Sequence, residues 1–184
     1  MRPFYTLFLL PAVMVSCSVR ADPYQINPQL STIVLNWQMI GRGTYHARIS
    51  GVNGRLTFSP SDDTRDTLQA AMPINRLDAH HRLLTLALKS RTFFDAAQYP
   101  DAVFSSSRLV ALGEGRYRVF GSLQIKNQRR PLILYAQQSS VSAQRLRLSA
   151  QTTVSRSDFG MGQYPLLVSD RIGVEIVLYA DRQP

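Results

Sequence analysis

Apolar and polar residues alternate along most of this chain, and this alternation predicts β-strands. Apolar side chains occupy every second position from Ile33 to Met39 and again from Ile172 to Leu178. A period of two gives each strand one apolar face. The pattern predicts a short extended start at 24–26 and strands over residues 33–39, 45–50, 55–59, 68–74, 102–112, 116–125, 131–137, 145–154 and 170–179.

One segment departs from this alternation and predicts a helix over residues 78–89. Its leucines are closely spaced, as on the apolar side of a helix, and Asp78 can cap its N-terminus. The next residues, from Phe93 to Pro100, are rich in aromatic rings and end in a proline, which a helix interior does not tolerate. We expect a helix end, a packed corner and a new strand near Ala102. The Gly-Val-Asn-Gly run at 51–54 predicts a hairpin turn.

Eight or nine strands with one helix are typical of an all-β domain. The pattern fits an antiparallel sandwich and a closed barrel equally well. An eight-stranded barrel has an interior just wide enough for packed side chains or one slim ligand. The choice between these two architectures therefore needs information beyond periodicity.

The first 21 residues have the features of a secretory signal peptide, which separates them from a single domain at 22–184. Arg2 precedes an apolar run from Phe4 to Val15. That run is shorter than the roughly 20 residues that a membrane-spanning helix needs. Small residues in Val19-Arg20-Ala21 fit a signal peptidase site. We therefore expect a periplasmic protein.

A second interpretation of this segment concerns Cys17, the single cysteine of the chain. The residues from Met14 to Cys17 resemble a lipobox, in which the cysteine is lipidated and becomes the new N-terminus. The alternative is therefore a protein anchored through Cys17. If cleavage instead follows Ala21, the mature chain has no thiol for a disulfide, for nucleophilic catalysis or for metal binding.

The chain is strongly basic, with 21 Lys and Arg against 12 Asp and Glu. Such a balance raises the question of nucleic acid or of an anionic membrane as a partner. The arginines are scattered, with no run longer than Arg129-Arg130, and a secreted protein does not meet cytoplasmic nucleic acid. We expect no nucleic acid. A plain solvated surface and peripheral contact with an anionic membrane both stay open.

Candidate catalytic and metal-binding residues are few. His80 and His81 are neighbours on the expected helix, so their side chains diverge by about 100° and do not readily share a metal. Serines are common, but none lies in a Gly-x-Ser-x-Gly elbow. We expect no metal, no cofactor and no enzyme activity. An envelope hydrolase stays as an alternative, which would need a serine within hydrogen-bond reach of a histidine.

Four segments, in order, resemble the pattern of the YceI-like family, and together they cover nearly all of the chain after residue 21. The second and fourth are the more specific. The segments are Tyr24-x-Ile26 with the Trp37 strand and Gly51 to Phe58, then Leu88 to Ser106, then Tyr117 to Pro131, and last Ser155 to Gly160 with Val168 to Asp170.

The resemblance implies an extended, eight-stranded, lipocalin-like antiparallel β-barrel with one α-helix. It also implies a binding or carrier protein whose apolar interior holds a long isoprenoid-type lipid, such as a quinone or a prenyl phosphate. The ligand-binding residues expected from this fold are Leu35, Trp37, Met39, Phe93, Phe94, Phe104, Phe120, Arg156 and Phe159. A register slip of one residue would invert any of these positions, Phe120 among them.

Arg156 has two interpretations. It either pairs with Asp158 at a barrel corner, where Phe159 fills the core and Gly160 permits the turn, or it faces the polar head of a lipid at the barrel mouth. The alternative function for the whole protein is an envelope interaction protein with a filled barrel and no ligand. A homodimer is also open.

Overall fold

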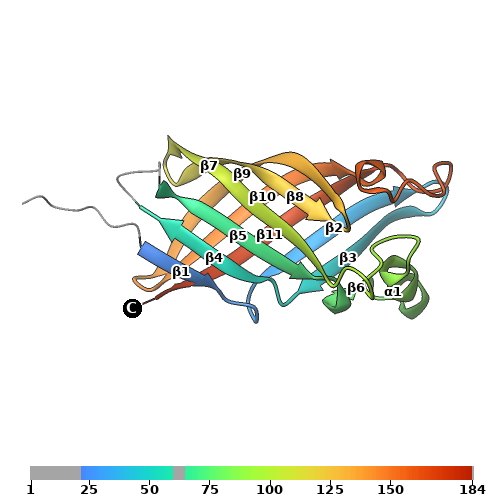
Figure 1. Ribbon diagram of the computed structural model, residues 1–184, viewed down its shortest axis with the longest axis horizontal. Helices are drawn as coiled ribbons and strands as arrows, with labels where there is room; N and C mark the ends of the chain where they lie inside the picture. Colours follow the sequence, from blue (N-terminus) through green and yellow to red (C-terminus); the bar gives the residue numbers. More distant parts are fainter. Residues whose placement is uncertain (1–21, 60–64, 184) are drawn as a thin grey trace, which may run out of the picture.

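The alternating segments form antiparallel strands that close into a barrel (Figure 1). The computed structural model describes residues 22–59 and 65–183. Eight strands follow one another around the closed ring, and the first pairs with the last. The predicted all-β, eight-stranded antiparallel barrel with one helix is confirmed. The ring strands are β1 (Asp22–Ile26), β4 (Asn53–Phe58), β5 (Thr67–Pro73), β7 (Asp101–Gly113), β8 (Arg116–Ile125), β9 (Gln128–Ser142), β10 (Arg145–Ser155) and β11 (Arg171–Arg182).

Three further strands lengthen the barrel at one end: β2 (Thr32–Met39), β3 (Gly43–Ser50) and β6 (Leu77–Asp78). β11 pairs with β1 near its C-terminal end and with β2 over residues 173–177. The closed ring therefore continues into an open wall made of β10, β11, β2 and β3. The helix lies at this open end of the molecule (Figure 1).

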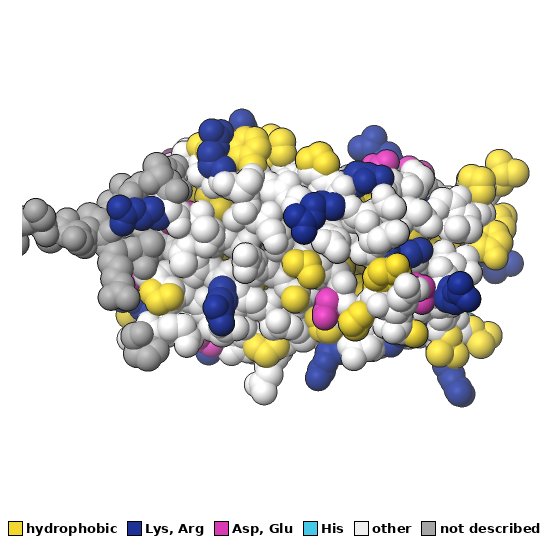
Figure 2. Space-filling model, viewed as in Figure 1, with side chains coloured by type: hydrophobic (Ala, Val, Ile, Leu, Met, Phe, Trp, Pro, Cys, Tyr) yellow, Lys and Arg dark blue, Asp and Glu magenta, His cyan; other side chains and the backbone are white. Residues whose placement is uncertain are grey.

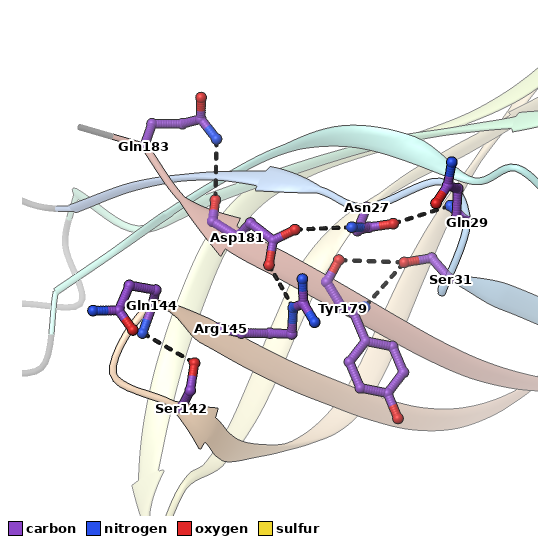
Figure 3. A network of polar contacts seen from close by, with 9 residues as sticks. All are labelled: Asn27, Gln29, Ser31, Ser142, Gln144, Arg145, Tyr179, Asp181 and Gln183. Carbon is purple, nitrogen blue, oxygen red and sulfur yellow. Dashed lines mark hydrogen bonds and ion pairs between the residues drawn. The ribbon is translucent and has the colours of Figure 1, made fainter.

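A network of polar contacts holds the break between β1 and β2 against β11 (Figure 3). Asp181 accepts from Asn27 Nδ2 at 2.9 Å and from Arg145 Nε at 2.5 Å. These two hydrogen bonds, the one from Arg145 first, hold the pKa of the Asp181 carboxyl below its usual range. Buried Ser31 accepts from the Tyr179 N–H at 2.9 Å and donates to the Tyr179 carbonyl at 3.3 Å. The contacts fix the register where β11 changes partner.

The hairpin predicted at Gly51 to Gly54 is wrong, because β3 and β4 pair with different neighbours. β3 pairs with β2 and β6, whereas β4 pairs with β1 and β5. β3 and β4 are therefore consecutive strands of different parts of the sheet, and the chain bends between them as it passes from the open wall into the ring. Gly54 has a φ of 148°, and a Cβ there would lie 2.0 Å from the Gln69 carbonyl oxygen. Only glycine fits where two strands approach so closely.

The helix α1 (Arg82–Lys89) begins later than the sequence predicts. Its cap is His81, whose Nδ1 accepts from the Leu84 N–H at 3.4 Å, and not Asp78. Asp78 belongs to β6 instead, and its carboxylate accepts from the His80 N–H at 2.9 Å and from the Thr85 hydroxyl at 3.3 Å. The aspartate therefore ties the helix to the sheet from outside the helix.

Two short 3₁₀ turns complete the fold, η2 (Ile74–Arg76) before β6 and η3 (Arg156–Phe159) after β10. The core combines inward-facing side chains of the ring with residues of β2, β3 and η2, and Ile26, Leu56 and Ile74 are among its most buried members. The predicted signal segment at residues 1–21 lies outside the described residues. In the part of the chain that the structure describes, no helix is long and apolar enough to cross a membrane.

Candidate functional site

Two apolar cavities lie one after the other inside the barrel, on the same inward strand faces. The ring cavity lies within the closed ring and has a volume of about 80 Å³, and the end chamber lies beyond it with about 270 Å³. On β2, Ile33 lines the ring cavity and Leu35 the end chamber, and on β11 Val174 and Ile172 divide in the same way. The interior is therefore narrow in the ring and wider at the open end.

The end chamber draws its walls from the open part of the sheet, from α1 and from two loops. Leu84 and Leu88 are four residues apart on α1, so they share the face that points into the chamber. All but one of the lining side chains are apolar or aromatic. They are Leu35, Trp37, Met39, Leu84, Leu88, Phe93, Phe94, Arg156, Met161, Tyr164, Leu167, Val168 and Ile172.

The corner after α1 places two aromatic rings in the chamber wall. The backbone turns tightly here, because the Phe94 N–H donates to the Leu88 carbonyl at 3.0 Å and the Asp95 N–H donates to the Ser90 carbonyl at 2.8 Å. This is the place at which the sequence predicts a packed corner. It places Phe93 and Phe94 in the wall of the end chamber.

Arg156 is the charged residue of the lining, and its exposed fraction is only 5%. Its guanidinium donates to four backbone carbonyls of the loop that follows η3. Nε donates to Ser169 at 3.0 Å, Nη2 to Val168 at 2.9 Å, and Nη1 to Gln163 at 2.6 Å and also to Met161. The loop is thus wrapped around one buried cation, which satisfies carbonyls that lie outside any strand.

An acidic partner lies at the base of this loop. Burial raises the pKa of Asp170, but hydrogen bonds from Ser157 and Ser155 and the nearby Arg156 charge outweigh it, and the pKa lies below its usual range. The Ser157 N–H donates to Asp170 Oδ1 at 2.9 Å. The carboxylate therefore stays ionised near Arg156, and the two ends of the loop are held together.

Two aromatic rings meet across the mouth of the chamber. Phe93, from the corner after α1, stacks on Tyr164 of the loop, with ring centroids 6.4 Å apart. Tyr164 has a φ of 59°, a left-handed conformation that is uncommon and costly for an aromatic residue. The surrounding loop holds the ring in place against this cost.

Seven of the nine expected ligand-binding residues line the interior. Phe104 faces the ring cavity. The other six meet in the end chamber although they come from distant parts of the chain: Leu35, Trp37, Met39, Phe93, Phe94 and Arg156. Whether these residues contact a ligand stays a prediction.

Phe120 is not where the sequence prediction put it. Its neighbour Val119 points into the ring, so Phe120 faces outward, where the Arg108 guanidinium lies 4.9 Å from its ring centroid. Phe159 is buried in the core but lines neither cavity. Arg156 donates to carbonyls and not to Asp158, so the expected ion pair is replaced by the carbonyl cradle.

The sequence prediction missed the part of the chamber made by the loop and the helix. A signal for the loop does exist, because residues 160–169 contain no charged residue, which is unusual in so basic a chain. For metals, the described residues contain no group of three or more potential ligands. The ring centroids of His46 and His80 are 5.6 Å apart, but that pair lies outside both cavities.

With the fold and the cavities established, relatives can be compared. The family model of the YceI-like domain matches residues 24–180. The chain belongs to the YceI-like family. A UPF0312 protein of Vibrio cholerae is 24% identical over 160 residues, which cover 83% of this chain and 85% of the relative. This YceI-like domain thus spans nearly the whole length of its curated relative.

Solved structures share the fold of this YceI-like domain at low sequence identity. Burkholderia cenocepacia BcnA has a TM-score of 0.75 at 19% identity, with 81% of this chain and 95% of that chain covered. A polyisoprenoid-binding domain of Saccharophagus degradans, implicated in plant cell wall breakdown, has a TM-score of 0.69 at 15% identity, with 87% and 98% covered. The Campylobacter jejuni YceI protein has a TM-score of 0.68 at 19% identity, with 75% and 85% covered.

Proposed function

We propose that this protein binds and carries a long apolar lipid of the isoprenoid type. The observation that carries the proposal is the interior itself, in which a narrow apolar cavity continues the line of a wider apolar chamber that contains one buried cation. A slim chain with a bulkier head matches this shape. The polyisoprenoid-binding domain of Saccharophagus degradans, which has a similar fold, supports the choice of ligand class.

The driving force is the removal of the chain from water. Burial of apolar surface stabilises a complex by about 25 cal/mol per Å², before the cost of immobilising the ligand is subtracted. No reacting group is needed for this function, so we propose a binding protein and not an enzyme. We propose a periplasmic location from the predicted signal segment, with lipidation at Cys17 as the alternative.

The head of the ligand is proposed to lie beside Arg156. Four N–H groups of this guanidinium are used by carbonyls, which leaves one N–H without a partner among the described residues. A phosphate is best bound by two parallel N–H groups. A single free N–H suits a single carbonyl oxygen better, so a quinone is favoured over a prenyl phosphate.

One observation favours the second candidate function, an interaction protein with a filled barrel. The ring cavity of about 80 Å³ is smaller than the roughly 300 Å³ at which ligand pockets usually begin. Under the carrier proposal, the end chamber holds most of the ligand. Side chains in the ring change conformation and make room for the tail of the ligand. Under the alternative nothing enters, and the protein carries no lipid.

Trp37 offers a direct test, because it is the single tryptophan of the chain and lines the end chamber. Quinones quench tryptophan fluorescence on contact, so titration with ubiquinone analogues of increasing tail length reports binding at this site. A prenyl phosphate is then added as a competitor. We expect saturable quenching that strengthens with tail length, and a protein isolated from its host that carries an extractable lipid by native mass spectrometry.

Two matched variants control the test. Val168→Phe adds a ring inside the chamber, whereas Val103→Phe adds the same ring on the exposed outer face of β7. We expect the first to weaken binding by roughly tenfold, or about 1.4 kcal/mol, and the second to leave it unchanged. No quenching, no competitor binding and no extractable lipid together would refute the carrier function and leave the interaction protein.

A further inference from the structure

Exposed apolar side chains gather at the open end of the barrel. Figure 2 shows hydrophobic and basic side chains together at the end of the molecule where α1 lies. Half of the large hydrophobic residues that are exposed in the described chain lie on three segments there. We call these six residues the apolar rim: Ile40, Leu83, Leu86, Tyr164, Leu166 and Leu167.

The helix contributes to the rim with a face that its own fold does not cover. α1 turns Leu84 and Leu88 into the chamber, but Leu83 and Leu86 are 71% and 57% exposed on its other side. A surface helix of a water-soluble protein normally carries polar side chains there. A helix that is apolar on both sides at a cavity mouth indicates that its outer side meets an apolar environment.

The loop and the β2–β3 turn extend the rim around the chamber. Leu166 is 82% exposed, and Leu167 and Tyr164 line the chamber while more than half of each is exposed. The Ile40 N–H donates to the Leu167 carbonyl at 3.0 Å, which joins the turn to the loop. The rim is therefore the outer edge of the chamber itself.

The charges on the rim segments are all of one sign. Residues 40–43, 82–91 and 160–169 contain no Asp or Glu, but they contain Arg42, Arg82, Lys89 and Arg91. The three arginines are exposed. Apolar side chains beside exposed cations match a bilayer surface, where acyl chains lie beneath anionic head groups.

We propose that the apolar rim docks the protein on an anionic lipid bilayer, with the mouth of the end chamber against the membrane. Leu166, Leu167 and the outer leucines of α1 enter the interface, while Arg42, Arg82 and Arg91 contact anionic head groups. The inference rests on the proposed function, because docking lets a lipid pass between bilayer and chamber without crossing water. The partner is a lipid surface and not a second copy of the chain.

The test is vesicle binding by the protein purified from its own host, so that all variants share the natural N-terminus. The vesicles contain either phosphatidylglycerol with phosphatidylethanolamine, or phosphatidylcholine alone. Leu83→Ser with Leu166→Ser replaces the two most exposed residues of the rim, and neither of them lines the end chamber. The matched control, Leu112→Ser with Val141→Ser, removes exposed apolar residues from the C-terminal ends of β7 and β9.

We expect the rim variant to bind the anionic vesicles roughly tenfold more weakly, and the control to bind as the parent does. Arg42→Gln with Arg91→Gln should reduce binding to anionic vesicles only, whereas Arg55→Gln with Arg147→Gln, which removes the same charge elsewhere, should not. Unchanged binding by the rim variant, or rim-dependent self-association in place of vesicle binding, would overturn the proposal.

Cargo binding is measured separately, by Trp37 quenching without vesicles. The rim variant should keep this signal, because neither Leu83 nor Leu166 lines the end chamber. If the parent protein binds anionic vesicles but quinone does not quench Trp37, the carrier function alone is rejected. If quinone quenches Trp37 but the parent protein does not bind anionic vesicles, the membrane-docking role of the rim alone is rejected.

Discussion

The closed ring and the end chamber are built in different ways. In the ring, each strand hydrogen-bonds to a neighbour on both sides, and most of the inward side chains are buried in the core. The end chamber is roofed by a two-turn helix with no fully buried residue and by a loop held around Arg156. The difference suggests that the ring supplies stability and the chamber supplies binding, and variants can separate the two.

The largest expected difference comes from shortening one leucine in each region. Leu56 lies in the ring and is 2% exposed, so Leu56→Ala should lower the free energy of unfolding of the protein by about 2–5 kcal/mol, because the substitution leaves a cavity. Leu84 of α1 is half-buried, so Leu84→Ala should lower the free energy of unfolding by only about 1 kcal/mol. Urea denaturation measures both. Equal losses would mean that the roof and the ring unfold as one unit.

Removal of the Arg156 guanidinium should damage the chamber more than the ring. Arg156→Met leaves four carbonyls without their donor, and we expect a loss of about 1–3 kcal/mol. Amide hydrogen exchange in residues 160–169 should become fast while exchange in the ring strands stays slow. Arg156→Lys is the control for charge, because lysine keeps the charge but not the planar fork. If it restores slow exchange, charge and not geometry holds the loop.

The Asp181 contacts should give the ring a modest dependence on pH. The Asp181 pKa is lowered in the folded state by Arg145 and Asn27, so its contribution to stability is present above the unfolded value of about 3.9. That contribution is lost as the pH falls through the lowered folded-state pKa. Because the pair is partly exposed, Asp181→Asn should cost only about 0.5–1 kcal/mol at neutral pH.

The measurement is the difference in unfolding free energy between the parent and Asp181→Asn across the acid range. It should shrink as the pH falls below about 4 and vanish once Asp181 is protonated in both states. A difference that does not change with pH would show that the ionisation of Asp181 contributes nothing to stability. Quenching of Trp37 by quinone should be the same in both proteins at neutral pH, since Asp181 is absent from the lining of the chamber.

The smallest effect on stability is expected at Tyr164. Tyr164→Asn relieves a left-handed backbone cost of about 1–2 kcal/mol and loses a ring contact of about 0.5–1.5 kcal/mol with Phe93. The two effects nearly cancel, but the mouth is wider. Stopped-flow quenching of Trp37 should show faster association of quinone. Tyr135→Asn on the outer face of β9 should leave the rate unchanged.

Much of the ring could be predicted from the sequence, because a period of two determines which side chains enter the core once a strand is recognised. β8 begins at Arg116 and ends at Ile125, the bounds that the sequence predicts. Phe120 shows that the prediction of a lining residue fails with an error of one position, because adjacent residues of a strand face the interior and the exterior in turn. Its outward place follows from the alternation of Val119 and Leu123, which are both buried.

The predictions failed where long-range pairing decides the structure. Gly51 to Gly54 has the composition of a hairpin turn, but the strands on either side find β2 and β1 as partners, which no local pattern reveals. The same holds for Arg156, whose acceptors are carbonyls of a loop that has no regular secondary structure. Family resemblance supplied the choice of barrel over sandwich, which periodicity left open.

The point at which the chain enters the barrel has a consequence for the direction of transfer. Asp22 begins β1 at the end opposite α1, beside the C-terminus (Figure 1). A lipid attached at Cys17, the alternative predicted from the sequence, would point the chamber away from the membrane that holds it. A tethered protein would then deliver to a facing membrane, whereas a freely diffusing one can turn toward either. Under the proposed carrier function, the processing site would therefore determine which membrane the chamber can face.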